Sequence, residues 1–384
     1  MPRVPANTSL FAATVVVASA AAAFAEAPKP IRVEIAVPNG SPREVAGTVL
    51  VEASDGGILM EQGDGRLEVI QPGTIVSRAP LAPIPPPESP RDLGRRILGE
   101  LPAGFDFLVT KHYLVCFDTS REYARWAASL FERLHDGFTN FWTRAGCELT
   151  DPERPLVVVI FSDRRRYEEH AALELGTAKD RVVGYYNMLS NRVTTFDLTG
   201  SGGQPAGRRP SAKASLDILA RPESAGLVAT LVHEATHQLA FNCGLHRRLA
   251  PVPLWVCEGV ATYCEAPDLS SDRGWRGIGG VNEPRRKQFL ETSKPGWLEP
   301  LLRNDDAFRK ATAATEAYAQ AWALTAFLIQ TKKSRFVDYL ALMAAKRPFD
   351  DDPEDLRVAD FSAAFGPPDA TMEQAVARFI SRMR

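Results

Sequence analysis

The first part of the chain alternates apolar and polar residues with a period of two, as half-buried β-strands do. Residues 31–37 and 47–52 alternate in this way. Asp-Gly and Pro-Gly pairs, which favour turns, bound two further short strands at residues 66–70 and 74–77. The pattern predicts about five short strands and therefore a small all-β module over residues 30–79, built as a β-barrel or an open sheet.

The rest of the chain reads as a linker followed by a mixed α+β domain. Proline-rich residues 80–92 predict an extended, semi-rigid spacer. Apolar residues on one face predict a helix over 120–144, and a continuous apolar run predicts a buried strand at 156–161. Helical periodicity dominates from residue 223 onward, which gives an α+β domain over residues 93–384. The other expected elements are a strand or hairpin at 107–117, a helix at 164–175, two strands within 184–197 and a low-complexity loop at 199–211.

Composition and the N-terminus restrict the class of protein. The 384 residues include 45 Lys+Arg and 47 Asp+Glu, so no basic excess is present to bind nucleic acid. Residues 1–25 combine an early arginine, an apolar stretch and a small-x-small ending, which is typical of a secretory signal peptide. We expect a secreted or periplasmic protein with no membrane span after cleavage. The alternative is that this segment is retained as a membrane anchor.

The five cysteines are too few for a disulfide scaffold, and an odd number cannot all pair within the chain. An extracytoplasmic compartment permits disulfides. A bond between Cys243 and Cys264 would brace two helical segments, although the sequence cannot fix the pairing. Cys257 is expected to act as a small buried apolar residue.

One segment carries chemistry that the composition does not suggest. The sequence His-Glu-Ala-Thr-His at residues 233–237 lies within 227–241, where apolar residues predict a helix. His233 and His237 are four residues apart, so both imidazoles lie on one helix face and reach one metal ion. Glu234 lies beside them and would take a proton from a water that the metal acidifies. The alternative is a helix with two surface histidines that hold no metal.

A third ligand is expected from a second helix over residues 253–263, which contains Glu258. A carboxylate among apolar neighbours is costly to bury unless it is paired or bound to a metal. Two histidines and one glutamate, with a fourth position open to water, suit Zn²⁺. The alternative is that Glu258 is a solvated residue near a helix end.

These two segments resemble the gluzincin metallopeptidases of the peptidase-MA-like superfamily and look closest to an uncharacterised bacterial branch of it. The resemblance covers roughly residues 105–345. It implies a zincin-like fold with peptide-bond hydrolysis as the activity and Glu234 as the general base. The residues that carry it are His233, Glu234 and His237, then Trp255, Glu258, Gly259 and Ala261. The resemblance makes His233, His237 and Glu258 the zinc ligands.

The resemblance also raises expectations about the surroundings of the metal. Such enzymes hold the developing oxyanion with a tyrosine or histidine. Tyr318 is the candidate here and His246 a substitute, whereas the alternative for Tyr318 is simple core packing. The strand at 192–197 would be the sheet edge along which an extended peptide pairs. In gluzincins an acidic residue one turn after the ligand glutamate orients a ligand histidine. Thr262 occupies that position here, so this support is weaker or differently built. Residues 282–287 form a charged turn that is either solvated or lines the cleft to bind a substrate carboxylate.

Two functions from different classes stay open. The first is a secreted or periplasmic zinc peptidase that acts on a peptide or protein substrate. The second is a catalytically weak or inactive zincin-fold binding module of the cell envelope. In either case the N-terminal β-module is a candidate contact for a cell-envelope partner. A water-accessible cleft to the metal position would favour the first function, and its closure would favour the second.

Overall fold

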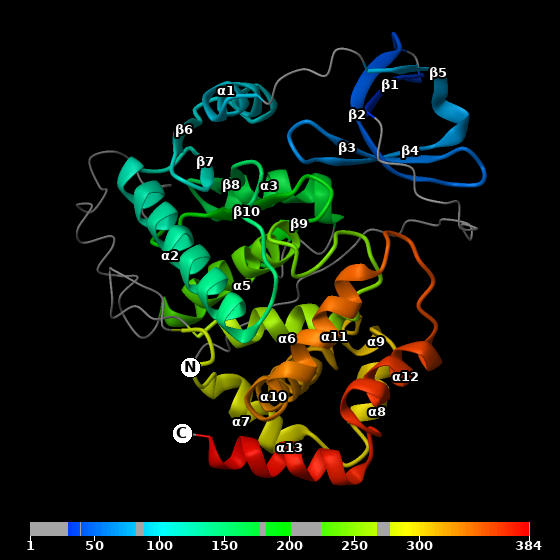
Figure 1. Cartoon of the computed structure of the whole chain (residues 1–384). Coiled ribbons are helices and arrows are strands. Elements are labelled where there is room, and N and C mark those ends of the chain that lie inside the picture. The colour runs from blue at the N-terminus through cyan, green and yellow to red at the C-terminus, as the bar shows by residue number, and fades with distance from the viewer. Residues whose placement is uncertain are drawn as a thin grey trace.

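The structure is a computed structural model that describes residues 30–38, 40–81, 88–176, 182–200, 224–266 and 277–383. Figure 1 shows an N-terminal sheet, a second sheet flanked by helices, and a helical C-terminal half. The fold is mixed α+β, as predicted. The expected signal segment and residues 201–211 of the expected loop lie outside the described residues. Across the described ranges, every helix is too short or too polar to cross a bilayer.

The N-terminal sheet contains the five strands that the period-two pattern predicts. They are β1 (Pro30–Ile35), β2 (Arg43–Glu52), β3 (Ile58–Gln62), β4 (Leu67–Ile70) and β5 (Ile75–Pro80), with a 3₁₀ turn at Pro72–Thr74. All pairs are antiparallel, in the order β4-β3-β2-β1-β5. Val33, Ile58 and Met60 lie in the core of this sheet.

Of the two expected arrangements, the described strands form the open sheet and not the barrel. The described strands leave β4 and β5 as its two edges and do not close it. The edge strand β4 bonds to the second part of the chain, because the backbone amide of Leu67 donates to the carbonyl oxygen of Leu189 at 2.7 Å. The β-module therefore uses this edge to dock onto the second part of the chain.

Arginines complete the junction between the β-module and the rest of the molecule. Arg248 donates to the carbonyl oxygens of Gly65 and Met188, at 2.7 and 3.2 Å. It also pairs with Glu61 at 2.8 Å, and its side chain is only 9% exposed. Arg96 of the first helix contacts the buried carboxylate of Asp64 at 2.9 Å. Because these contacts are largely shielded from water, they hold the module more firmly than surface ion pairs would.

The second sheet has the order β6-β7-β8-β10-β9. Its strands are β6 (Asp106–Val109), β7 (Tyr113–Phe117), β8 (Leu156–Phe161), β9 (Gly184–Asn187) and β10 (Arg192–Phe196). The three central strands are parallel, and the edge strands β6 and β9 run antiparallel to their neighbours. The expected edge strand at 192–197 is therefore misplaced, since β10 lies between β8 and β9. The edge on that side is β9.

Helices cover both faces of this sheet. On one face α1 (Pro90–Glu100) and α3 (Arg164–Leu175) pack against Leu114 and Val159. On the other face α2 (Arg121–Ala145) and α5 (Ala225–Asn242) pack against Val158 and Ile160. The alternation along β8 thus places successive residues in two cores, as expected for a buried parallel strand. The predicted linker is shorter than expected, because α1 begins at Pro90, where Ser89 caps the helix through the amide of Asp92.

The C-terminal half is helical, as predicted. Its elements are α6 (Leu254–Cys264), α7 (Glu283–Thr292), α8 (Leu298–Arg303), α9 (Asp306–Arg309), α10 (Ala314–Thr331), α11 (Lys333–Ala345), α12 (Glu354–Phe365) and α13 (Ala370–Arg382). The helix α10 is buried along most of its length and packs against α6. Gly259 makes this close approach possible, because a Cβ there would lie 2.1 Å from Thr325 Oγ1.

Candidate metal centre

The helix α5 carries the His-Glu-Ala-Thr-His motif through the middle of the protein. Residues 230–241 are buried without interruption, because α5 is covered by the second sheet, α2 and α6. Gln238 fixes the helix to the sheet, since its Nε2 donates to the carbonyls of Val157 and Asn191 at 3.0 and 2.9 Å. The rings of His233 and His237 lie side by side, with centroids 4.7 Å apart. The helix spacing places them together as predicted.

Glu258 approaches the two histidines from α6. Its Oε2 lies 3.0 Å from His233 Nε2 and 3.5 Å from His237 Nε2. The two Nε2 atoms are 3.1 Å apart. Ligands at about 2.1 Å from a tetrahedral Zn²⁺ are separated by roughly 3.4 Å, which is close to all three distances. The structure thus brings together the three residues that the sequence suggested as ligands.

The hydrogen-bond partners of this cluster indicate why its ligand atoms suit a cation. Nδ1 of His233 lies 2.9 Å from a carboxylate oxygen of Glu265, which places the N–H on that nitrogen. The lone pair of Nε2 then points at the Glu258 carboxylate and at the second imidazole. Oε1 of Glu258 has no hydrogen bond among the described residues, and the side chain is fully buried. Converging lone pairs repel unless positive charge lies between them, so the residues fit a bound divalent ion.

The pKa shifts of His233 and Glu258 agree with a cation bound among these side chains. Burial acts to lower the pKa of His233, but its contacts with Glu258 and Glu265 outweigh burial and raise it to about 10. Burial acts to raise the pKa of Glu258, yet the two histidines bring it down to about 2. The arrangement therefore favours an anionic Glu258 and a positive charge at the point where the three side chains meet.

Glu265 is the functional residue that the sequence reasoning missed. It stands at the C-terminal cap of α6, where it accepts a hydrogen bond from His233. Its other oxygen accepts from Asn282 Nδ2 at 2.8 Å and from Arg285 Nε at 3.1 Å. Burial acts to raise its pKa, but Arg285 and the other donors lower it to about 2. A carboxylate that holds a ligand histidine in one tautomer is the usual support of a metal site.

The expected position for this support, Thr262, has another role. Its Oγ1 donates to the carbonyl oxygen of Glu258 at 2.7 Å, within α6. The charged turn at residues 282–287 is solvated only in part, since the side chains of Glu283 and Lys287 are exposed. Asn282 caps α7, and together with Arg285 it binds the Glu265 carboxylate instead.

A family model described as a protein of unknown function (DUF1570) matches residues 227–350. No curated protein matches the chain. The matched span includes the two histidines of α5, Glu258 and Glu265. It begins inside α5 and therefore leaves out both β-sheets.

Glu234 lies next to the histidines and faces the edge of the second sheet. Its Oε2 accepts a hydrogen bond from the backbone amide of Tyr186, in β9, at 2.9 Å. The side chain is almost completely buried. Burial raises the pKa of Glu234, and His233 and His237 partly oppose this. A raised pKa makes a carboxylate a better proton acceptor near neutral pH.

The two candidates for oxyanion stabilisation lie on different sides of the centre. The Tyr318 ring in α10 is 6.2 Å from the His233 ring and packs between Phe308 and Arg285. Tyr318 therefore contacts the site and also has the core-packing role expected as its alternative. His246 is buried, and its two ring nitrogens have no hydrogen bond among the described residues. Burial lowers the pKa of His246 to about 3, and proximity to His237 adds to this.

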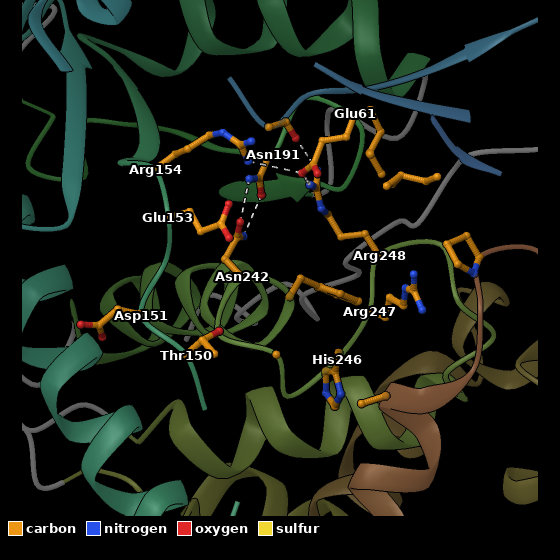
Figure 2. Close-up of a pocket in the computed structure, with 17 residues that line it drawn as sticks. Glu61, Thr150, Asp151, Glu153, Arg154, Asn191, Asn242, His246, Arg247 and Arg248 are labelled. Carbon is orange, nitrogen blue, oxygen red and sulfur yellow. Dashed lines mark hydrogen bonds and ion pairs between the residues drawn. The ribbon is translucent and has the colours of Figure 1, made fainter. Parts of the chain in front are cut away.

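A cavity of about 520 Å³ lies between the β-module and the C-terminal end of α5 (Figure 2). Its lining residues include His246 and Asn242 but neither ligand histidine. His233, His237 and Glu258 are each at most 1% exposed. The three side chains are therefore buried, and the cavity lined by His246 and Asn242 does not include them.

The bond between Cys243 and Cys264 that the sequence left open is not formed, since all five cysteines are free thiols. The Cys264 thiol contacts Thr236, which lies seven residues before Cys243 along the chain. At 1.5 Å per residue this separates the two positions by roughly 10 Å, beyond the usual Cα span of a disulfide of about 7 Å. Cys257 is buried in the apolar core, as expected.

Proposed function

We propose that the protein is a zinc-dependent peptidase of the gluzincin type with a zincin-like catalytic domain. The observation that carries the proposal is the convergence of His233, His237 and Glu258 within metal-ligand spacing, with Glu234 directly beside them. The tautomer imposed on His233 by Glu265 supports it further, because it leaves Nε2 available as a ligand.

The side chains divide the chemistry of peptide hydrolysis among them. His233, His237 and Glu258 would hold the ion, and Glu265 keeps the first histidine in place. A bound Zn²⁺ supplies Lewis acidity, which polarises a carbonyl group and makes water easier to deprotonate. Glu234 accepts the proton of the attacking water and passes it to the leaving amine. Tyr318 is the candidate donor to the oxygen that becomes negatively charged.

The setting that we propose is extracytoplasmic, with residues 1–25 as a removed signal peptide and a peptide or protein as substrate. Of the two edge strands, β6 and β9, the proposed site for pairing with an extended peptide is β9, because its Tyr186 amide contacts Glu234. The β-module is the proposed contact for a cell-envelope partner.

The experiment compares the full chain with its Glu234→Gln variant. Zinc content is measured by mass spectrometry, and hydrolysis is measured on a peptide library. We expect equal zinc in both proteins and a loss of about 10²–10⁴-fold in the rate of hydrolysis, the usual contribution of a general base. Glu283→Gln is the control, since that side chain is 65% exposed and pairs only with Arg286 among the contacts described. An active Glu234→Gln variant would overturn the mechanism.

The burial of the centre favours a second candidate, a zinc-holding binding module without activity. All three ligands and Glu234 are at most 2% exposed. Under this candidate the wild-type chain binds zinc but cleaves no library peptide, and Glu234→Gln changes nothing. Cleavage by the wild type that is lost in the variant excludes it.

A further inference from the structure

A second group of metal-ligand residues lies apart from the centre described above. His112 stands in the turn between β6 and β7, His135 in α2, and Asp151 in the connection from α2 to β8. One ligand atom from each lies within 4.8 Å of the others. His135 Nε2 is 3.8 Å from Asp151 Oδ1.

Three of the four ring nitrogens of this group are buried without a hydrogen-bond partner among the described residues. His135 is 3% exposed and His112 is 8% exposed. Neither nitrogen of His135, nor Nε2 of His112, makes a hydrogen bond to any residue in the described ranges. His135 Nδ1 also lies 3.6 Å from Asp136 Oδ1, which is beyond hydrogen-bond distance. Buried polar atoms are normally satisfied, so three such nitrogens near the carboxylates of Asp151 and Asp136 indicate a ligand at this point.

Glu132 prepares one of the two histidines for metal binding. Its Oε2 lies 2.6 Å from His112 Nδ1, and its Oε1 accepts from the backbone amide of His112 at 2.8 Å. Thr110 donates to the same Oε1 at 2.6 Å. The proton of the His112 ring is therefore fixed on Nδ1, and the lone pair of Nε2 is exposed to the group. This is the arrangement by which a carboxylate orients a metal-binding histidine.

The rings as they stand are stacked, with centroids 3.7 Å apart and planes inclined by 18°. Parallel rings direct their lone pairs side by side, so one ring must turn about χ2 before both nitrogens face a single ion. That torsion joins an sp³ to an sp² carbon and has broad wells, so the turn costs little torsional energy. Asp151 offers the entry route, because its side chain is 69% exposed at the rim of the cavity shown in Figure 2.

We propose that His112, His135 and Asp151 form a second site for a divalent transition-metal ion, with Zn²⁺ the best match to two imidazoles and a carboxylate. An ion held there ties the β6–β7 turn to α2 and to the loop before β8. The residue before Asp151 in that loop, Thr150, donates its amide to the carbonyl of Cys243 at 3.1 Å. The second site therefore braces the C-terminal end of α5, the helix that carries the candidate catalytic centre.

The test counts zinc per chain in the full-length protein after removal of metal with a chelator and reloading with zinc alone. We expect two zinc ions in the wild type, one in His237→Gln, one in His135→Gln and none in the double variant. His170→Gln is the matched control, because His170 belongs to neither metal-ligand group, and it should hold two. A wild type with a single zinc that His237→Gln removes would overturn the proposal, as would His135→Gln that still holds two. If only the centre on α5 fails to bind zinc, the wild type holds one zinc, which His135→Gln removes and His237→Gln does not. That result would contradict the proposed function and support the second site.

Circular dichroism checks that each variant is folded. If His135→Gln does not fold, Asp151→Asn replaces it, because the exposed Asp151 side chain does not support the core. In that variant we expect the Kd of the second zinc to rise about tenfold or more, with the first unchanged. An unchanged Kd for the second zinc would refute the site.

Discussion

Replacing Glu265 by glutamine tests the construction of the metal centre without touching a ligand. In the structure the two carboxylate oxygens of Glu265 accept from three donors, on His233, Asn282 and Arg285. A glutamine side chain has one acceptor oxygen, and its amide nitrogen must face either the histidine N–H or the other two donors. One side of the contact therefore becomes donor against donor, and a guanidinium that is only 12% exposed loses its counter-charge.

The expected size of the effect follows from the position of Glu265 beside a ligand rather than on the ion. Removing a partner that orients a metal-binding histidine typically weakens metal binding by about 10- to 100-fold. This corresponds to roughly 1.4–2.7 kcal/mol of binding free energy. Loss of a ligand, as in Glu258→Gln, should cost more than this.

The assay is a zinc competition between the full chain and a chromophoric chelator, with circular dichroism to confirm folding. Glu283→Gln is the control, since it makes the same chemical change at an exposed position of α7. We expect the Kd for zinc to rise by 10- to 100-fold in Glu265→Gln, about the range given by such partners, and to stay constant in the control. A folded Glu265→Gln protein with a Kd within about twofold of the wild type would refute our account of how His233 is held.

Three further predictions concern stability. Gly259→Ala should lower the free energy of unfolding by about 1–3 kcal/mol in urea denaturation, because the new Cβ would meet Thr325 Oγ1 at 2.1 Å; Gly99→Ala, with no atom within 4 Å, should not. Arg248→Met should lower the free energy of unfolding by about 1.5–3 kcal/mol and speed proteolysis of the β-module, since it removes the charged donor from the Gly65 carbonyl and from Glu61. Burial acts to raise the pKa of Asp64, but two arginines lower it overall. Ionised Asp64 therefore stabilises the folded state above about pH 4, and this stabilisation is lost as the pH falls through the folded pKa. The Asp64→Asn variant should therefore lose less stability than the wild type between about pH 4 and pH 2, and an equal loss would contradict this sign.

The parts of the fold that depend on local pattern could be predicted from the sequence. The buried strand at 156–161 and the helix at 164–175 match β8 and α3 in both bounds. The approach of His233 to His237 follows from the helix repeat alone. Glu258 required a further inference, that a carboxylate in an apolar segment must have a partner, and the structure brings it to both histidines.

The parts that failed depend on how elements are ordered in space. The edge strand was misassigned because strand order in a sheet need not follow chain order. β10 follows β9 in the chain but lies between β8 and β9 in the sheet. The choice between a barrel and an open sheet, and the pairing of the cysteines, could not be settled for the same reason, since both depend on a long-range pairing that local patterns do not specify. Glu265 was missed although a signal was available. It lies seven residues after Glu258, two turns along α6, and so returns to nearly the same helix face.

The charges buried around the centre explain why these residues form one unit. Glu234, Glu258 and Glu265 are all buried, and Arg285 supplies one positive charge against them. With both imidazoles of the centre neutral, the group carries a net charge of about −2, which is costly to remove from water. Either two protons on the imidazoles or one divalent cation restores neutrality. A cation also leaves both Nε2 lone pairs engaged, whereas protons on these nitrogens would point at each other across 3.1 Å. The carboxylate of Glu265 and the guanidinium of Arg285 are therefore as much a part of the proposed metal site as the motif on α5.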